Sequence, residues 1–174
     1  LMGAFVTLFN YIGYRLLAAP YNLDQVFVGL LSVVYLSGIY SSAKIGSLAD
    51  RLGRRNVLWA VIVLMLAGVA LTMFEPLAVV IVGVLLFTFG FFGAHSVASS
   101  WIGRRALKAK GQASSLYLFS YYAGSSVAGT AGGVCWHYAG WNGIGLFIGA
   151  LLLIALAVAL RLKKLPPLQV AAQV

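Results

Sequence analysis

The chain has 174 residues, of which 62% are hydrophobic and only 9% are charged, whereas a soluble domain carries about 25% charged residues. This composition excludes a soluble globular domain and a disordered chain, and the single cysteine, Cys135, excludes a disulfide scaffold. The net charge of +9 is gathered at the ends of apolar segments, which is typical of a membrane protein. We therefore expect the lipid bilayer as a partner and no nucleic acid.

Six apolar segments follow one another, each long enough for a transmembrane helix and too long for a strand. The short connections between them leave no room for a soluble domain. The sequence predicts an all-α membrane protein, with a six-helix membrane domain over residues 1–165 and a short cytoplasmic tail over residues 166–174. The expected helices cover residues about 3–19, 26–48, 57–74, 77–102, 112–137 and 141–160.

Basic residues occur only at alternate ends of these segments, with one exception, Arg15. The connections after the first, third and fifth segments carry no Lys or Arg. By the positive-inside rule the basic ends face the cytoplasm, so we expect a multi-pass protein with both termini cytoplasmic. The apolar start at Leu1, without a basic region or cleavage site, indicates a piece of a longer polytopic protein rather than a signal peptide. The other eleven basic residues are Lys44, Arg51, Arg54, Arg55, Arg104, Arg105, Lys108, Lys110, Arg161, Lys163 and Lys164.

Polar side chains are distributed in a repeating order. The third and sixth segments are almost free of them, whereas the other four carry polar residues well inside their apolar stretch. A membrane helix with such residues must turn them toward protein or water. The order polar, polar, apolar occurs twice, which indicates two three-helix repeats, a recurring arrangement in secondary transporters.

The connection between the second and third segments contains a complete motif. It reads Gly-Ser-Leu-Ala-Asp-Arg-Leu-Gly-Arg-Arg over residues 46–55 and resembles the G-x-L-x-D-R-x-G-R-[KR] loop of the major facilitator superfamily. In that family the loop acts as a conformational latch and not as a substrate site. The resemblance assigns this role to Gly46, Asp50, Arg51, Gly53, Arg54 and Arg55.

The resemblance extends over the whole chain. The family has twelve helices in two halves, and this chain is similar to the C-terminal half of a YnfM-type bacterial inner-membrane permease, in the drug- and sugar-efflux-like branch. It implies secondary active transport of a small molecule by alternating access, with proton-coupled efflux as the expected activity. It also implies no cofactor, and a missing N-terminal six-helix half as partner. Residues 124–133 are similar to the branch's glycine-rich antiporter motif, but they lack its Gly-Pro pair and favour antiport only weakly.

Polar and aromatic side chains inside the helices are candidates for a substrate cavity. Arg15 could bind an anionic or hydroxyl-rich substrate through its planar fork of donors; alternatively it snorkels to the nearby membrane surface. Tyrosine rings and hydroxyl groups would suit a sugar or an aromatic drug, or they could simply fill contacts between helices. The candidates are Asn10, Tyr14, Arg15, Tyr40, His95, Tyr117 and Tyr121.

His95 is also the candidate for proton coupling. The three carboxylates, Asp24, Asp50 and Glu75, all lie in connections, and the ordinary pKa of histidine suits proton transfer near neutral pH. The alternative is a neutral histidine that forms one hydrogen bond between helices.

Small residues repeat every four positions in the fifth segment and would let another helix approach closely. These packing candidates are Gly124, Gly129, Gly132 and Gly133.

No sequence feature indicates an enzyme or a metal site: G-x-S-x-G and phosphate-binding loops are absent, and one cysteine with two distant histidines forms no metal-ligating set. Two alternatives to a transporter remain. One is a truncated or degenerate half-transporter with a structural or dimerising role, and the other is a channel-like pore, which the latch motif disfavours.

Overall fold

The computed structural model describes residues 1–106 and 108–164, and every element in this part of the chain is helical. The predicted all-α class is confirmed. The predicted tail, residues 166–174, lies outside the described residues. The elements are α1 (Met2–Leu17), α2 (Gln25–Leu30), the 3-10 turn η1 (Leu31–Val34), α3 (Tyr35–Leu52), α4 (Arg54–Leu71), α5 (Leu77–Arg105) and α6 (Lys110–Lys163).

Four continuous helical stretches among the described residues are long and apolar enough to cross a membrane. This finding confirms the prediction of apolar helices of membrane length. One of them runs from α2 through η1 to the end of α3, and another is the 54-residue α6. Helix α1 has 16 residues, or about 24 Å at 1.5 Å per residue, shorter than a hydrocarbon core of about 30 Å. Six membrane crossings therefore remain a prediction.

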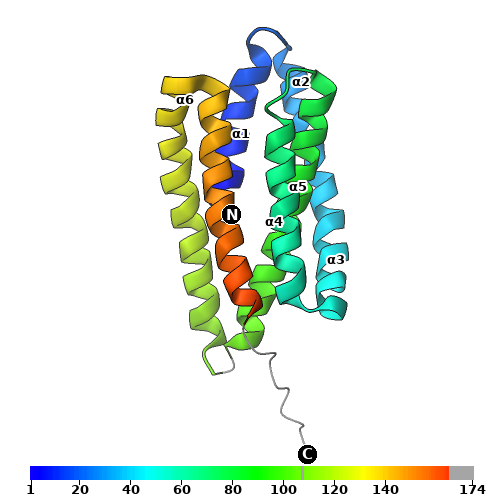
Figure 1. The fold of residues 1–174 in the computed structure, drawn as a ribbon, viewed down its shortest axis with the longest axis vertical. Helices are drawn as coiled ribbons and strands as arrows, with labels where there is room; N and C mark the ends of the chain where they lie inside the picture. The colour runs from blue at the N-terminus through cyan, green and yellow to red at the C-terminus, as the bar shows by residue number, and fades with distance from the viewer. Residues whose placement is uncertain (107, 165–174) are drawn as a thin grey trace, which may run out of the picture.

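Helix α6 is two helices joined by a sharp break. Ala139 and Gly140 leave the helical conformation, and Gly140 has φ +52°, which glycine adopts without a steric penalty. The chain reverses there, so α6 forms two antiparallel arms, coloured yellow and orange in Figure 1. The first arm covers residues 110–138 and the second arm covers residues 141–163.

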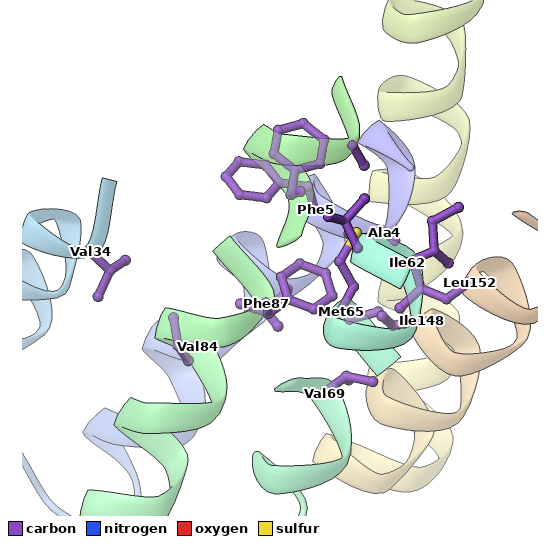
Figure 2. Close-up of a cluster of buried hydrophobic side chains, with 14 of the residues drawn as sticks. Ala4, Phe5, Val34, Ile62, Met65, Val69, Val84, Phe87, Ile148 and Leu152 are labelled. Atoms are coloured by element: carbon purple, nitrogen blue, oxygen red, sulfur yellow. The ribbon is translucent and has the colours of Figure 1, made fainter. Parts of the chain in front are cut away.

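The hydrophobic core lies where α1, α4, α5 and the second arm of α6 meet. Phe5, Met65, Phe87, Ile148 and Leu152 point toward one another there (Figure 2) and are at most 7% exposed. Helix α3 packs on the outer side of α5, and the first arm packs on α1. The core therefore joins the two predicted repeats into one bundle.

The two ends of the bundle differ in charge. The basic residues at the ends of the second, fourth and sixth expected helices form three clusters. Arg104 lies 3.2 Å from Asp50, and the Lys163 ammonium lies 5.1 Å from the Trp59 ring centroid, so these three clusters gather at one end (the lower end in Figure 1). We call this the basic end. The α1–α2 connection, the α4–α5 turn and the α6 break lie at the opposite end.

The four tryptophans mark both ends. Trp59 lies in the second turn of α4 and Trp101 in the last turns of α5, near the basic end, whereas Trp136 and Trp141 flank the α6 break. The second arm from Trp141 to Lys163 measures about 33 Å at 1.5 Å per residue, close to the hydrocarbon thickness of about 30 Å. Tryptophans near both ends of the bundle are typical of the aromatic belts of membrane proteins.

Candidate functional site

The motif of residues 46–55, for which a latch role is predicted, forms a charged bridge at the basic end. Asp50 at the end of α3 accepts hydrogen bonds from Arg54 at 2.6 Å and from Arg104 at 3.2 Å. The Arg54 Nε donates to the Ser100 hydroxyl at 3.0 Å. Gly53 provides the turn between α3 and α4 with φ +88°, a conformation that favours glycine. The motif thus connects the α3–α4 turn to the C-terminal end of α5.

The remaining motif residues surround this bridge. Arg51 is exposed and Arg55 is half-buried. A Cβ added at Gly46 would lie 3.4 Å from the Ser96 hydroxyl of α5, so α3 runs close to α5 here. The motif's pattern of charges predicted a basic turn, but not that its partner would be Arg104.

His95 on α5 lies against tyrosines of the first arm of α6. The Tyr117 hydroxyl and the His95 Nδ1 are 2.7 Å apart, and which group donates depends on the histidine tautomer. The His95 ring centroid is 5.0 Å from that of Tyr121 and 6.1 Å from that of Phe91. Three predicted cavity residues, His95, Tyr117 and Tyr121, are therefore brought together. We call these residues, with Phe91 and Tyr122, the His95 cluster.

The His95 cluster is only partly covered by the rest of the chain. His95, Tyr117 and Tyr121 are of intermediate exposure, and Tyr122 is 62% exposed. Phe91 continues the aromatic contacts to Phe5 of α1, with ring centroids 4.0 Å apart. Sequence reasoning missed Phe91, although its position one turn before His95 on the same face of α5 was a usable signal.

Asn10, Tyr14 and Tyr40 lie apart from the His95 cluster. Asn10 is exposed and Tyr14 is 61% exposed, with the Tyr14 ring 6.1 Å from that of Trp136. Tyr40 is 59% exposed on α3, and the Lys44 ammonium lies 5.7 Å from its ring centroid. Their predicted role in a substrate cavity stays a prediction.

Arg15 is the centre of a second cluster, at the end opposite the basic end. Its guanidinium donates to the Thr72 carbonyl, to the Phe74 carbonyl at 2.8 Å and to the Tyr21 hydroxyl at 3.1 Å. It also lies 5.0 Å from the Trp141 ring centroid, and the Trp141 indole N–H donates to the Thr72 carbonyl at 2.8 Å. We call these five residues the Arg15 cluster. The contacts of the Arg15 cluster connect α1, the α4–α5 turn and the second arm.

The glycine stripe of the first arm faces α1. The Thr7 hydroxyl donates to the Ala128 carbonyl at 3.1 Å, and the Tyr11 hydroxyl donates to the Gly129 carbonyl at 3.3 Å. A Cβ at Gly132 would lie 2.9 Å from Thr7 and Tyr11 atoms, and a Cβ at Gly133 would lie 3.1 Å from the Tyr11 hydroxyl. Gly124 differs, since a Cβ there would meet no atom within 4 Å.

Comparisons with known proteins give the class of the chain. The Major Facilitator Superfamily profile matches residues 1–173, and the chain belongs to this family. It is 59% identical over 164 residues to the inner membrane transport protein YnfM of Escherichia coli, covering 94% of this chain and 39% of YnfM. It is 53% identical over 156 residues to the uncharacterized MFS-type transporter YybF of Bacillus subtilis, covering 90% of this chain and 39% of YybF.

A third relative is an uncharacterized transporter of Buchnera aphidicola from Schizaphis graminum. It is 48% identical over 164 residues, covering 94% of this chain and 40% of the relative. The chain thus spans about two fifths of the length of these curated relatives. No solved structure matches the chain significantly. The predicted family, and the likeness to YnfM-type permeases, are confirmed.

Proposed function

We propose that this chain is one six-helix half of a secondary active transporter that moves a small molecule by alternating access, together with an N-terminal half of similar size. Family membership supports the class, and the length of the relatives supports a second half. The observation that carries the proposal is the open His95 cluster in the middle of apolar helices.

The depth of His95 argues that its cluster faces water or protein. Along α5, His95 lies about 15 Å from Arg105 at 1.5 Å per residue, which is half of a hydrocarbon core of about 30 Å. Polar side chains at that depth turn toward a partner helix or an aqueous cavity. Because the described part of the chain leaves the cluster partly open, the second half and the substrate pathway lie beside it.

The basic end faces the cytoplasm in this proposal. The gathering of three basic clusters at one end agrees with the positive-inside rule, and the opposite end holds Asp24 and Glu75 in its connections. The intact protein is then a multi-pass protein of the bacterial inner membrane, with both termini cytoplasmic. The name of the relative YnfM supports this location.

Coupling to protons is assigned to His95 if this half takes part in it. The carboxylates lie at the two ends of the bundle, and Asp50 is held by two arginines. His95 has a direct hydrogen-bonding partner in Tyr117, through which a proton could be passed. Efflux by proton antiport is the activity we propose.

We assign Arg15 a structural role, in which it holds neighbouring helices together and does not contact the substrate. Its donors face two backbone carbonyls and a hydroxyl. A substrate would have to displace these acceptors to bind the guanidinium.

A transport screen tests the proposed function. Everted vesicles containing the intact protein would be energised with a proton gradient and offered radiolabelled sugars and fluorescent aromatic compounds. We expect accumulation of at least one compound that collapses when a protonophore is added. Identical accumulation by vesicles without the protein, across both classes, would favour the alternative of a half-transporter without transport of its own.

A further inference from the structure

An apolar cavity extends from the basic end to within one helical turn of the His95 cluster, because Ala98 of α5 is also part of its lining. It has a volume of about 420 Å³ and is bounded by Leu58 of α4, Trp101, Ile102 and Arg105 of α5, and Ala113 and Leu162 at the two ends of α6. Sites for small ligands in proteins occupy about 300–1,000 Å³. The cavity is therefore large enough for an organic ligand. Its mostly apolar lining favours a ligand with an apolar body.

The charge that the described residues contribute to the cavity lining is positive. Arg105 is the charged residue of the lining, and Lys163 lies nearby on the Trp59 ring. Asp50, the acidic residue at this end, is engaged by Arg54 and Arg104. An occupant that joins an apolar body to an anionic group is complementary to this arrangement.

The position of the cavity indicates where such an occupant comes from. Trp101 lines the cavity, and Trp59 lies beside Lys163. Tryptophan concentrates where the hydrocarbon of a bilayer meets its headgroups. At that depth the available amphipathic anion is a phospholipid of the same leaflet, and basic pockets between membrane helices on the cytoplasmic side bind acidic headgroups.

We propose that this cavity is a binding site for an anionic phospholipid, with part of one acyl chain against Leu58, Ile102 and Leu162 and the phosphate at Arg105. The inference requires only that the chain lies in a membrane. It does not depend on transport, so it can fail or succeed separately from the proposed function.

Trp101 provides the measurement, because brominated acyl chains quench tryptophan fluorescence on contact. The intact protein and its Trp101→Phe variant are reconstituted in phosphatidylcholine vesicles with increasing fractions of dibrominated phosphatidylglycerol or dibrominated phosphatidylcholine. The difference between the two proteins gives the Trp101 signal. We expect half-maximal quenching at about a fivefold lower mole fraction of phosphatidylglycerol than of phosphatidylcholine.

Variants of the lining separate a site from general charge attraction. Arg105→Gln should abolish the preference, Arg105→Lys should keep it, and Ala113→Leu should weaken Trp101 quenching by filling the cavity. Lys44→Gln is the matched control, because it removes a charge from a basic cluster outside the lining. Equal quenching by both lipids would overturn the proposal. So would a preference for phosphatidylglycerol that survives in Arg105→Gln, or a loss of that preference in Lys44→Gln as large as in Arg105→Gln.

Discussion

His95 and Tyr117 form a hydrogen bond between α5 and the first arm of α6, at 2.7 Å. Such a bond suits a proton relay and also a fixed contact between helices. The two roles differ in one property, because only the relay requires that His95 change its protonation state during transport. A substitution that keeps hydrogen bonding but cannot be protonated therefore distinguishes them.

His95→Gln should flatten the pH dependence of transport and weaken accumulation against a gradient, because glutamine does not titrate. Downhill exchange should survive, because substrate binding and the change between the two open conformations need no proton at this site. The measurement is uptake into vesicles across a range of pH, with and without a gradient. Uphill transport with an unchanged pH response would show that His95 is structural.

Arg15 allows a prediction about stability. Arg15→Ala removes hydrogen bonds to two carbonyls and a hydroxyl and the contact with the Trp141 ring. We expect the free energy of unfolding to fall by about 2–3 kcal/mol, with a smaller loss for Arg15→Lys, which keeps the charge but not the planar fork. Thermal unfolding of the purified intact protein measures this. Unchanged stability with a large loss of substrate affinity would instead make Arg15 a substrate ligand.

At the scale of helices, Gly132 sets the approach of the first arm to α1. A methyl group there would lie 2.9 Å from atoms of Thr7 and Tyr11, whereas at Gly124 it would meet open space. We expect Gly132→Ala to destabilise the protein by about 1–3 kcal/mol. Gly124→Ala is the matched control and should be neutral or slightly stabilising, because alanine favours helices. Equal effects of the two variants on the unfolding temperature would contradict this packing.

Asp50 connects elements through bonds that are exposed to solvent. Because exposed ion pairs contribute about 1 kcal/mol or less, Asp50→Asn should leave the unfolding temperature nearly unchanged. We expect transport turnover to fall severalfold with substrate affinity almost constant, since the bridge to Arg54 and Arg104 includes no residue of the His95 cluster. A large affinity loss at constant turnover would place Asp50 at the binding site.

The helical elements could be read from the sequence because apolar segments of membrane length are separated by turn residues. The break at Ala139 and Gly140 lies between the expected fifth helix, over about 112–137, and the expected sixth, over about 141–160. The 3-10 turn at Leu31–Val34 was not predicted, because no residue in it excludes a regular helix. Helix α4 also begins at Arg54, earlier than the apolar pattern indicates, because polar residues can continue a helix beyond the bilayer.

The sites were less predictable than the helices. Helical spacing placed His95, Tyr117 and Tyr121 on suitable faces, but only the packing of α5 against the first arm brings them within contact. The partners of Arg15 could not be foreseen, because Thr72 and Phe74 contribute backbone carbonyls, which carry no signal in the side-chain pattern.

At the scale of the whole molecule, the charge asymmetry predicts orientation. Single cysteines in place of Arg51 and Lys108 should resist an impermeant maleimide applied to intact cells, in a background where Cys135 and any other native cysteine are replaced. A cysteine in place of Gln25, at the opposite end, should react. Rapid labelling at Arg51 or Lys108 and protection at Gln25 would reverse the orientation.

In the proposed transporter, the face carrying the His95 cluster lines a pathway open in turn to both sides of the membrane. Tyr122 and Leu153 are similarly exposed in this chain, at 62% and 58%, but Leu153 lies on the apolar second arm. The most direct test compares Tyr122→Cys and Leu153→Cys in the intact protein, using an impermeant maleimide in whole cells and in everted vesicles. We predict that Tyr122→Cys reacts from both sides and that Leu153→Cys, facing lipid, reacts from neither. Protection of Tyr122→Cys from both sides would contradict the account.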